Sequence, residues 1–470
     1  MTPRTQQILR SLPSIDALLE HEEVRAWTQA LPRTLVIAAL RAAVEQIRGA
    51  IRSGKIDRPV EITDLLGIAE EELTRRATPS LRRVINATGI VLHTGLGRAP
   101  LCEAAVDAIV ETASGYCNLE YDLQAGGRGR RVSHVVQTLA QITGAQSATV
   151  MNNNAAATLL ILTALAKDRE VIVSRGQLIE IGGSYRLPDV MAASGAVLCE
   201  VGTTNRTRIG DYESEINDRT AILMCVHTSN FRVVGFTEET PLDEMVTLAR
   251  RFDLLAVHDL GSGAMFDLTD HGLPAEPYVR RSIHIGADLV CFSGDKLLGG
   301  PQCGVIVGRA DLIRRIESNP LMRTHRVGKL TLAALEATLR HYVDPQDAMT
   351  NIPGLSMLAA STDTLAQRAN ELSQRLENTL PDEHFYVCSD VAYAGGGSLP
   401  AKALDTVVVQ WRPSCLGADA ALKALRDSEV PVIARIRDEA VCFDLRTTPP
   451  RDFDDLVAGV TSALMDAESD

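Results

Sequence analysis

The chain has 470 residues, of which 45% are hydrophobic and 23% charged, a composition typical of a globular protein and not of a disordered one. This length exceeds a single hydrophobic core, so we expect two or three domains, and no apolar run is long enough to span a bilayer. The net charge of −13 argues against a DNA-binding protein or one coated with nucleic acid, although it is compatible with a local basic face.

Residues 1–72 are predicted to form a helical domain. Apolar residues recur at helical spacing in EVRAWTQALPRTLVIAALRAAVEQIRGAIRSG, and this run ends at a glycine. Residues 1–85 carry 13 Lys and Arg against 11 Asp and Glu, so they form the least acidic part of the chain. Several arginines recur along the run: Arg33, Arg41, Arg48 and Arg52. An ordinary solvated helix face is the simpler explanation for each of these arginines taken alone.

A linker, residues 73–92, is predicted to lead into a core over residues 93–340. From about residue 145 to 310, short apolar runs such as EVIVSRG and TAILMCVHTSN alternate with helical stretches. This alternation predicts a mostly parallel sheet with helices on both faces. Long helices and then strands follow in residues 341–470 and indicate a smaller C-terminal α/β domain. The predicted fold class is therefore α/β.

Open parallel sheets bind ligands at the carboxyl ends of their strands, so polar residues at predicted strand ends are candidate site residues. Asn152, Asn153 and Asn154 lie between the predicted strand and helix of TVMNNNAAATLL. The N-terminus of such a helix can bind a phosphate through its free N–H groups. Ordinary helix capping by asparagine explains the same stretch equally well, so both interpretations stay open.

Asp259 and Ser293 end two further predicted strands, and Lys296 follows Ser293 in the glycine-rich turn of DLVCFSGDKLLGGPQCGVIVG. Pyridoxal phosphate (PLP) requires a lysine for its Schiff base, a carboxylate that keeps its pyridine nitrogen protonated, and an anion site for its phosphate. Taken singly, Lys296 is explained as a solvated hairpin lysine and Asp259 as a turn cap. Together they favour a PLP site. The sequence contains no dinucleotide-binding or P-loop motif at these junctions and no C-x-x-C pair, and we expect no metal.

Six blocks of the sequence are distinctive: RRVINATGIVLHTGLGRAPL, GYCNLEYDLQAGGRGRR, VMNNNAAATLL, VHDLGSG, SGDKLLGGPQCGVIVG and MRTHRVGKLTLAALEATL. They closely resemble the bacterial selenocysteine synthases, the L-seryl-tRNA(Sec) selenium transferases, and the resemblance extends over nearly the whole chain. It implies a fold-type-I PLP-dependent enzyme that assembles as a homodecamer built from dimers. It also implies a cytoplasmic enzyme, which agrees with an N-terminus that lacks the apolar core of a signal peptide.

The resemblance implies that the enzyme converts seryl-tRNA(Sec) into selenocysteinyl-tRNA(Sec) with selenophosphate, through a PLP-bound aminoacrylyl-tRNA intermediate. The N-terminal domain is expected to bind the tRNA. Lys296 is expected to hold the cofactor and then to remove the α-proton of serine. Asp259 is expected to pair with the pyridine nitrogen.

The remaining implied contacts concern the cofactor and the selenium donor. The residues expected to contact PLP are Asn153, Asn154, Asn230 and Ser293, with Asn230 at the phenolic oxygen. The residues expected to bind the phosphate of selenophosphate are Arg98, Arg323 and Arg326. Guanidinium groups match tetrahedral oxyanions, and the esterified serine has no carboxylate for them to bind. A solvated loop or helix start is the alternative explanation for Arg323 and Arg326.

Two other functions remain open from the sequence. One is a PLP-dependent lyase that acts on small amino-sugar acids, for which the helical region has no evident use. The other is a non-catalytic tRNA-binding relative that has kept the fold, against which the presence of Lys296 and Asp259 argues.

Overall fold

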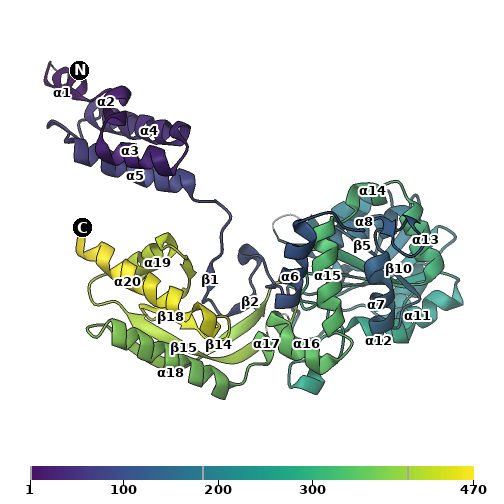
Figure 1. Ribbon diagram of the computed structural model, residues 1–470. Helices are drawn as coiled ribbons and strands as arrows, with labels where there is room; N and C mark the ends of the chain where they lie inside the picture. Colours follow the sequence, from purple (N-terminus) through teal and green to yellow (C-terminus); the bar gives the residue numbers. More distant parts are fainter. Residues whose placement is uncertain (1–2, 183–184, 400–401, 470) are drawn as a thin grey trace. The chain divides into compact units, whose positions relative to one another are not determined.

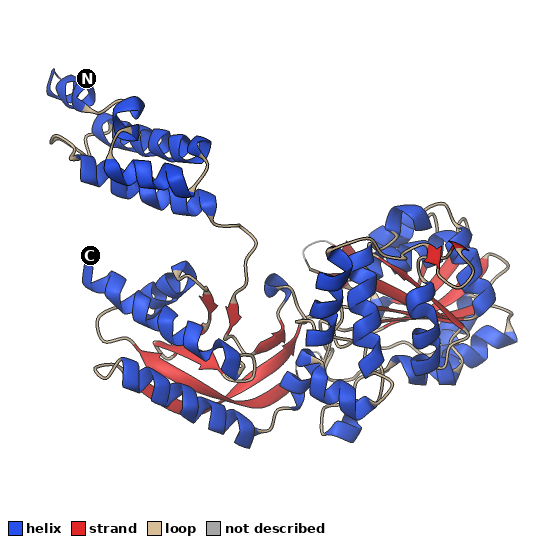
Figure 2. Cartoon of the chain, in the orientation of Figure 1, coloured by secondary structure: helices blue, strands red, loops and turns tan. Residues whose placement is uncertain are grey.

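The computed structural model describes residues 3–182, 185–399 and 402–469. The chain forms two compact units, Met1–Arg83 and Val84–Asp470, which Figure 1 colours from purple at the N-terminus to yellow at the C-terminus. Figure 2 shows that the first unit is helical and that the second contains two separate sheets. In the described part of the chain, no helix combines the length and the apolar character needed to cross a membrane.

The first unit is a bundle of helices with its own hydrophobic core. Its helices are α1 (Pro3–Ser11), α2 (Ile15–Leu19), α3 (Glu22–Ala30), α4 (Arg33–Arg52) and α5 (Ile62–Ala77). Pro32 separates α3 from α4, because proline has no N–H to continue a helix. One face of α4 buries Val36, Leu40 and Ile47, whereas Arg41 is exposed. The predicted N-terminal helical region is therefore confirmed.

The second unit is built on a central sheet of seven strands. In spatial order they are β5 (Ser147–Met151), β13 (Gly304–Gly308), β12 (Leu289–Ser293), β11 (Leu255–Gly261), β10 (Thr220–Val226), β6 (Glu170–Ser174) and β9 (Val197–Val201). Strand β13 runs antiparallel to both neighbours, and all other pairs are parallel. Strands β6, β12 and β13 are buried along their whole length, as expected for a sheet covered on both faces. The predicted α/β fold class is confirmed.

Helices cover both faces of this sheet. One hydrophobic core includes residues of α6, α7 and α15, and another includes residues of α8, α9 and α13. The helices of this region are α6 (Glu103–Ala113), α7 (Ser133–Thr143), α8 (Asn154–Leu165), α9 (Leu187–Ser194), α10 (Ile209–Glu215), α11 (Leu242–Arg251), α12 (Val279–Ile285), α13 (Ala310–Ser318), α14 (Met322–His325), α15 (Lys329–His341), α16 (Pro345–Asn351) and α17 (Pro353–Ala359). Two small hairpins were not predicted: β3 (Tyr121–Asp122) with β4 (Gly127–Arg128), and β7 (Glu180–Ile181) with β8 (Tyr185–Arg186). Short 3-10 helices lie at Thr94–Leu96, Arg175–Gln177, Leu268–His271 and Pro450–Asp452.

A second sheet of five strands carries most of the C-terminal part of the chain. Its order is β17 (Arg435–Arg437), β18 (Ala440–Asp444), β15 (Ala403–Arg412), β14 (His384–Gly395) and β2 (Ile90–Leu92). The other elements here are α18 (Thr362–Thr379), α19 (Ala418–Asp427), α20 (Phe453–Ser469) and the parallel pair β1 (Ile85–Asn86) and β16 (Val432–Ile433). Trp411 stacks between Phe385 and Phe443, with ring centroids 6.5 Å away on either side.

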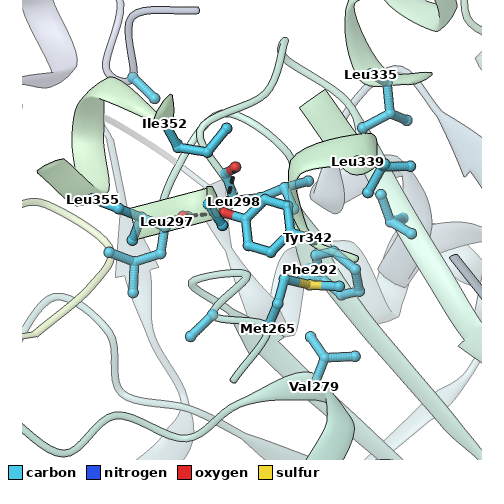
Figure 3. Packing of buried hydrophobic residues seen from close by; sticks show 14 of the residues in the cluster. Met265, Val279, Phe292, Leu297, Leu298, Leu335, Leu339, Tyr342, Ile352 and Leu355 are labelled. Atoms are coloured by element: carbon cyan, nitrogen blue, oxygen red, sulfur yellow. Dashed lines mark hydrogen bonds between the residues drawn. The ribbon is translucent and has the colours of Figure 1, made fainter. Parts of the chain in front are cut away.

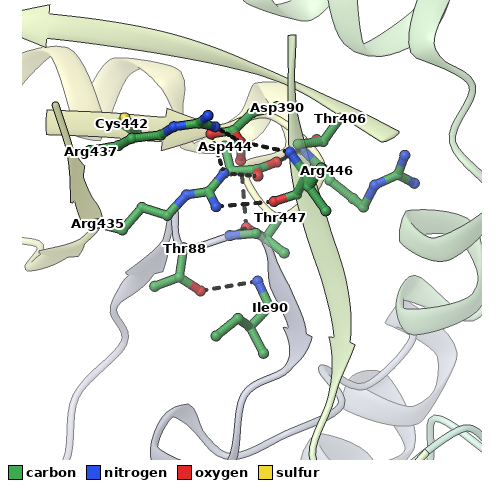
Figure 4. Close-up of polar contacts among 12 residues, drawn as sticks. Thr88, Ile90, Asp390, Thr406, Arg435, Arg437, Cys442, Asp444, Arg446 and Thr447 are labelled. Carbon is green, nitrogen blue, oxygen red and sulfur yellow. Dashed lines mark hydrogen bonds and ion pairs between the residues drawn. The ribbon is translucent and has the colours of Figure 1, made fainter. Parts of the chain in front are cut away.

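A buried polar cluster around Asp444 lies where the segment before β2 meets this sheet (Figure 4). Asp444 accepts hydrogen bonds from Thr406 Oγ1 at 2.7 Å and from Arg435 Nη2 at 2.9 Å, which offset the cost of burying its charge. Burial nevertheless raises the pKa of Asp444 above its ordinary value. Thr447, three residues later, accepts a hydrogen bond from the Gly89 N–H at 3.0 Å. Strand β2 therefore joins the sheet through side-chain contacts as well as through its pairing with β14.

The turn that contains Lys296 rests on a buried tyrosine (Figure 3). The Tyr342 hydroxyl, at the end of α15, donates to the carbonyl oxygens of Leu297 at 3.2 Å and Leu298 at 2.8 Å. Both leucine side chains are buried in the core that also contains Met265 and Ile352. Turn carbonyls that are out of contact with water need such partners. The tyrosine therefore fixes the backbone that follows the lysine.

We expect Tyr342→Phe to lower the stability of the second unit. The substitution leaves two buried carbonyl groups without their donor, at a cost of about 1–3 kcal/mol. Urea unfolding followed by circular dichroism measures the loss, with Tyr386→Phe on the exposed side of β14 as the control. An unchanged unfolding midpoint for Tyr342→Phe would show that the hydroxyl does not stabilise the turn.

Candidate functional site

Lys296 is buried, with 5% of its surface exposed. It lies in the turn between β12 and β13, and the interpretation as a solvated hairpin lysine is therefore wrong. Burial lowers the pKa of its ammonium group below the ordinary value, and the nearby charge of Arg98 lowers it further. A buried lysine with a lowered pKa supplies more of the neutral amine, which is the form that reacts with carbonyl groups and accepts protons.

Asp259 lies on β11, next to β12 in the sheet, and is also buried. Its Oδ1 accepts a hydrogen bond from Asn154 Nδ2 at 2.7 Å, and its Oδ2 accepts one from Thr158 Oγ1 at 3.0 Å. Burial raises the pKa of Asp259, whereas the two donors and the charge of Lys296 act in the opposite direction. The carboxylate is thus oriented by two side chains of one helix, α8. Its burial would be further compensated by a cationic group bound beside it.

Lys296 and Asp259 line the same cavity, which has a volume of about 420 Å³. The cavity lies at the carboxyl ends of β10, β11 and β12, where open α/β sheets bind their ligands. Its lining includes six of the predicted site residues: Arg98, Asn153, Asn154, Asp259, Ser293 and Lys296. It does not include the other three: Asn230, Arg323 and Arg326.

The asparagines divide their roles at the start of α8. The Asn153 side chain accepts a hydrogen bond from the Ala156 N–H at 2.8 Å, so it caps the helix, which was one of the two open interpretations. Asn154 binds Asp259 instead, and its Oδ1 is buried without a hydrogen-bond partner among the described residues. The asparagine turn packs closely against Gly304 on β13. A Cβ at this position would lie only 2.1 Å from the backbone carbonyl oxygen of Asn153. The first turn of α8 therefore faces the cavity.

Ser229 takes the place in the cavity that was expected of Asn230. The Ser229 N–H donates to the His227 carbonyl at 2.8 Å, a three-residue turn that reverses the chain just after β10. Ser229 is consequently buried and lines the cavity, whereas Asn230 is exposed and donates to the Glu180 carbonyl at 2.7 Å. The sequence alone does not reveal which of two adjacent residues such a turn directs inward.

The three arginines lie in two places. Arg98 lines the cavity and donates to Asp295 Oδ2 at 2.7 Å, and its φ of +62° is unusual for a residue other than glycine. Arg323 and Arg326 are exposed, in and just after α14. The segment between them adjoins the asparagine turn, since the His325 carbonyl accepts a hydrogen bond from the Asn152 N–H at 2.9 Å.

A glycine in a loop that follows the second sheet leaves space beside the Lys296 amine. Gly397, in the loop after β14, has a φ of +95°, and a Cβ at this position would lie 2.5 Å from Lys296 Nζ. Any side chain there would collide with the amine. A buried amine, a buried carboxylate and a helix N-terminus thus surround one unobstructed cavity. This donor set fits the cofactor expected from the sequence.

The sequence did not predict several residues that the structure places in the site. Thr158 follows Asn154 by four residues in a helix, so helical spacing alone would have placed the two on one face. His227 and Tyr185 also line the cavity, but no pattern in the sequence distinguishes them from packing residues. In the described part of the chain, no group of three or more His, Cys, Asp or Glu side chains is arranged to hold a metal ion.

Comparison with known proteins identifies the family. Residues 84–449 match the model described as "L-seryl-tRNA selenium transferase", and residues 9–48 match "Selenocysteine synthase N terminal". A protein of Clostridium botulinum strain Loch Maree named L-seryl-tRNA(Sec) selenium transferase is 45% identical over 452 residues, which cover 96% of this chain and 98% of that protein. One of the same name from Nitratidesulfovibrio vulgaris is 46% identical over 469 residues, which cover 97% and 99%.

A solved structure shares the fold. The structure of D-glucosaminate-6-phosphate ammonia-lyase superposes with a TM-score of 0.58 at 20% identity, covering 84% of this chain and 99% of that one. At this identity the likeness concerns the fold alone, and it agrees with the fold-type-I architecture expected from the sequence. Because a family model matches most of the chain and relatives are similar over nearly all of it, the chain belongs to the L-seryl-tRNA selenium transferase family.

Proposed function

We propose that this protein converts seryl-tRNA(Sec) into selenocysteinyl-tRNA(Sec), with selenophosphate as the selenium donor and PLP as the cofactor. The observation that carries the proposal is the pairing of buried Lys296 with buried Asp259 across one cavity at the carboxyl edge of the sheet. Family membership supplies the substrate class, and the site supplies the residues that the reaction needs.

Bound PLP would supply an electron sink that makes the α-proton of the attached serine acidic. Lys296 would hold the cofactor through its amine, and Asp259 would pair with the ring nitrogen. The first turn of α8, with Asn153 and Asn154, would bind the phosphate through backbone N–H groups. Ser293 and Ser229 lie in the same lining and would complete the contacts.

The burial of Lys296 determines its second role. Burial lowers the pKa of the amine and so favours the neutral form, and the amine beside the bound serine would take the α-proton. The serine is esterified to tRNA and so carries no free carboxylate. The cavity accordingly needs no arginine for that group, and Arg98, which is held by Asp295, would bind the donor's phosphate together with Arg323 and Arg326. The last two would have to approach from the α14 segment beside the asparagine turn.

The organisation of the chain fits a large substrate. We assign residues 1–72 to tRNA binding, 93–340 to the catalytic core and 341–470 to a smaller C-terminal domain. The expected linker, 73–92, includes the end of α5 and the strands β1 and β2, and the boundary of the two units lies between Arg83 and Val84. Exposed arginines on α4, among them Arg41 and Arg52, offer phosphate contacts that a small-molecule enzyme would not need. We further propose that the enzyme is cytoplasmic and assembles as a decamer built from dimers.

The two alternatives have less support. A lyase of small amino-sugar acids shares the fold, but only at 20% identity, and the relatives that match at 45–46% over 96–97% of the chain carry the transferase name. A non-catalytic tRNA-binding relative would have no need to bury Lys296 and Asp259, because a buried charge without a function costs stability.

The first prediction tests the cofactor lysine. The purified protein should bind PLP and turn yellow, and borohydride should fix the cofactor to Lys296, as located by peptide mass spectrometry. Lys296→Ala should lose both the fixed adduct and turnover. Lys423→Ala, at an exposed lysine on α19, should retain both. A Lys296→Ala protein with normal turnover would refute the assignment.

The second prediction separates selenium transfer from dehydration. The double substitution Arg323→Ala and Arg326→Ala should leave seryl-tRNA binding and dehydration intact. Selenium transfer should fall at least about 10²-fold, since a charge-assisted hydrogen bond contributes about 1.5–3 kcal/mol. Selenium-75 incorporation and tRNA retention measure the two steps on the same samples, with Arg314→Ala on α13 as the control. Normal selenium transfer would place the donor site elsewhere.

The third prediction concerns tRNA binding. Arg41→Ala with Arg52→Ala should weaken binding of seryl-tRNA and reduce its salt dependence by about one unit of log–log slope for each phosphate that is no longer bound. Arg48 is the matched control, because its charge is already paired with Glu45 at 2.5 Å. Filter binding at several salt concentrations gives both quantities. Equal slopes for all the variants would exclude this face of α4 as the surface that binds tRNA.

A further inference from the structure

A second cluster of buried polar groups lies beside Lys296 and is not used in the mechanism above. His227 Nδ1, Glu276 Oε1 and Ser398 Oγ are buried and lack a hydrogen-bond partner in the described part of the chain, and the buried Ser262 hydroxyl lies against Glu276. Native structures leave few buried polar atoms unpaired, and those that remain commonly serve catalysis or bind a missing group. One such atom on the carboxyl group of Glu276, with two more beside it on His227 and Ser398, therefore indicates a functional cluster.

Glu276 is the centre of this cluster. Its Oε1 lies 3.7 Å from His227 Nδ1, slightly beyond hydrogen-bonding distance, and its side chain is only 2% exposed. The Ser262 hydroxyl adjoins the carboxyl group. Its Oε2 accepts a hydrogen bond from the Leu399 N–H at 3.3 Å, which brings Ser398 alongside. The carboxyl group is thus held next to the imidazole without being neutralised by a close cation.

His227 connects the cluster to the Lys296 cavity. The imidazole lines that cavity and also an adjoining one of about 700 Å³, which Glu276 lines as well. Its backbone N–H donates to the Asp259 carbonyl at 2.9 Å, which fixes it directly after β10. The loop that places Leu399 on Glu276 also places Gly397 against Lys296 Nζ. One loop therefore sets the position of both groups.

The protonation states of the pair are complementary. Burial lowers the pKa of His227 to about 4, so its imidazole is neutral at pH 7. Burial raises the pKa of Glu276 to about 7, so a large share of its carboxyl groups keep their proton. The groups on the Lys296 side are Arg98, Tyr185, Asp259 and Lys296. The groups around the larger cavity are Cys225, Glu239, Asp243, His258, Asp267, Tyr278 and Arg281. Lys402 acts on Glu276 from outside the cavity lining.

Building on the proposed function, we propose that Glu276 and His227 form a proton relay that protonates the serine hydroxyl group as it leaves. The Cβ–O bond breaks, its electron pair stays on the oxygen, and a proton from His227 completes a water molecule. In the same step the neutral imidazole accepts a proton at Nδ1 from Glu276, which becomes a carboxylate, so that no imidazolate is formed. The electron pair of the Cα–H bond forms the Cα=Cβ bond, and Lys296 takes that proton. The proton gained by Lys296 balances the one lost by Glu276.

The relay answers a chemical requirement of the reaction. Hydroxide is a poor leaving group, and the lysine cannot take up the α-proton and donate one to the oxygen at the same moment. A separate acid on another wall of the cavity removes this conflict. A positioned general acid contributes about 10²–10⁴-fold to a rate. In this scheme His227 touches the substrate as a catalytic residue, and Glu276 acts through it as a positioning residue and proton store.

The first test needs neither cofactor nor turnover. Infrared difference spectra between acidic and neutral pH, recorded on the protein without PLP, should contain the C=O stretch of a protonated carboxyl group that titrates near pH 7. This band should disappear in Glu276→Gln and persist in Asp243→Asn, which removes an exposed carboxylate from the same cavity. Persistence of the band in Glu276→Gln would overturn the relay.

The second test measures dehydration of seryl-tRNA in a single turnover. Glu276→Gln and His227→Asn should each slow this step by about 10²-fold or more, with unchanged tRNA affinity. Wild-type dehydration should decline as pH rises through about 7, because Glu276 loses its proton there, and Glu276→Gln should lack this decline. Full-rate dehydration by Glu276→Gln overturns the relay and leaves the proposed function standing. Failure of the wild type to dehydrate seryl-tRNA overturns the proposed function, and the infrared test then decides the relay separately.

Discussion

Two ionisable groups of opposite charge are buried in one cavity at the edge of a parallel sheet, and the rest of the site depends on this constraint. Taking a carboxylate or an ammonium group out of water costs several kcal/mol, so each needs compensation. Asp259 receives two hydrogen bonds from α8. Lys296 responds to its burial by a lowered pKa. Burying two charged groups would destabilise an ordinary hydrophobic core. Here the burial favours the neutral, reactive form of the Lys296 amine, in the same cavity as the Asp259 carboxylate.

The surrounding fold keeps this arrangement rigid. Parallel strands β10, β11 and β12 bring their carboxyl ends to one edge. The Tyr342 hydroxyl donates a hydrogen bond to the turn after Lys296, at the Leu298 carbonyl. The second sheet contributes from the opposite side, because its longest strand, β14, ends in the loop that places Gly397 beside the amine. The site is therefore built from both sheets of the second unit. A change of packing between them would alter the space beside Lys296 directly.

Acid and base functions are kept on different walls of the cavity. Lys296 approaches from the β12–β13 turn, and His227 approaches from the end of β10 with Glu276 behind it. Burial moves the pKa values of the imidazole and the carboxyl group in opposite directions, towards about 4 and about 7. Two groups whose environments separate their pKa values in this way suit an elimination, in which one proton is removed as another is delivered. Arg323 and Arg326 lie outside the cavity lining, whereas Arg98 lines the same cavity as Lys296 and His227.

The sequence by itself determined the fold class, the strand and helix pattern around residues 145–310, and the identity of Lys296 and Asp259 as a pair. These features follow from local periodicity and from strand ends, which a linear pattern records. Only the tertiary structure decided which neighbours complete the site. Whether Ser229 or Asn230 faces inward depends on a three-residue turn, and the pairing of β2 with β14 joins segments about 300 residues apart. Gly397 approaches Lys296, and Glu276 approaches His227, through the packing of separate loops. Such contacts depend on the arrangement of whole elements, and no local spacing in the chain encodes them.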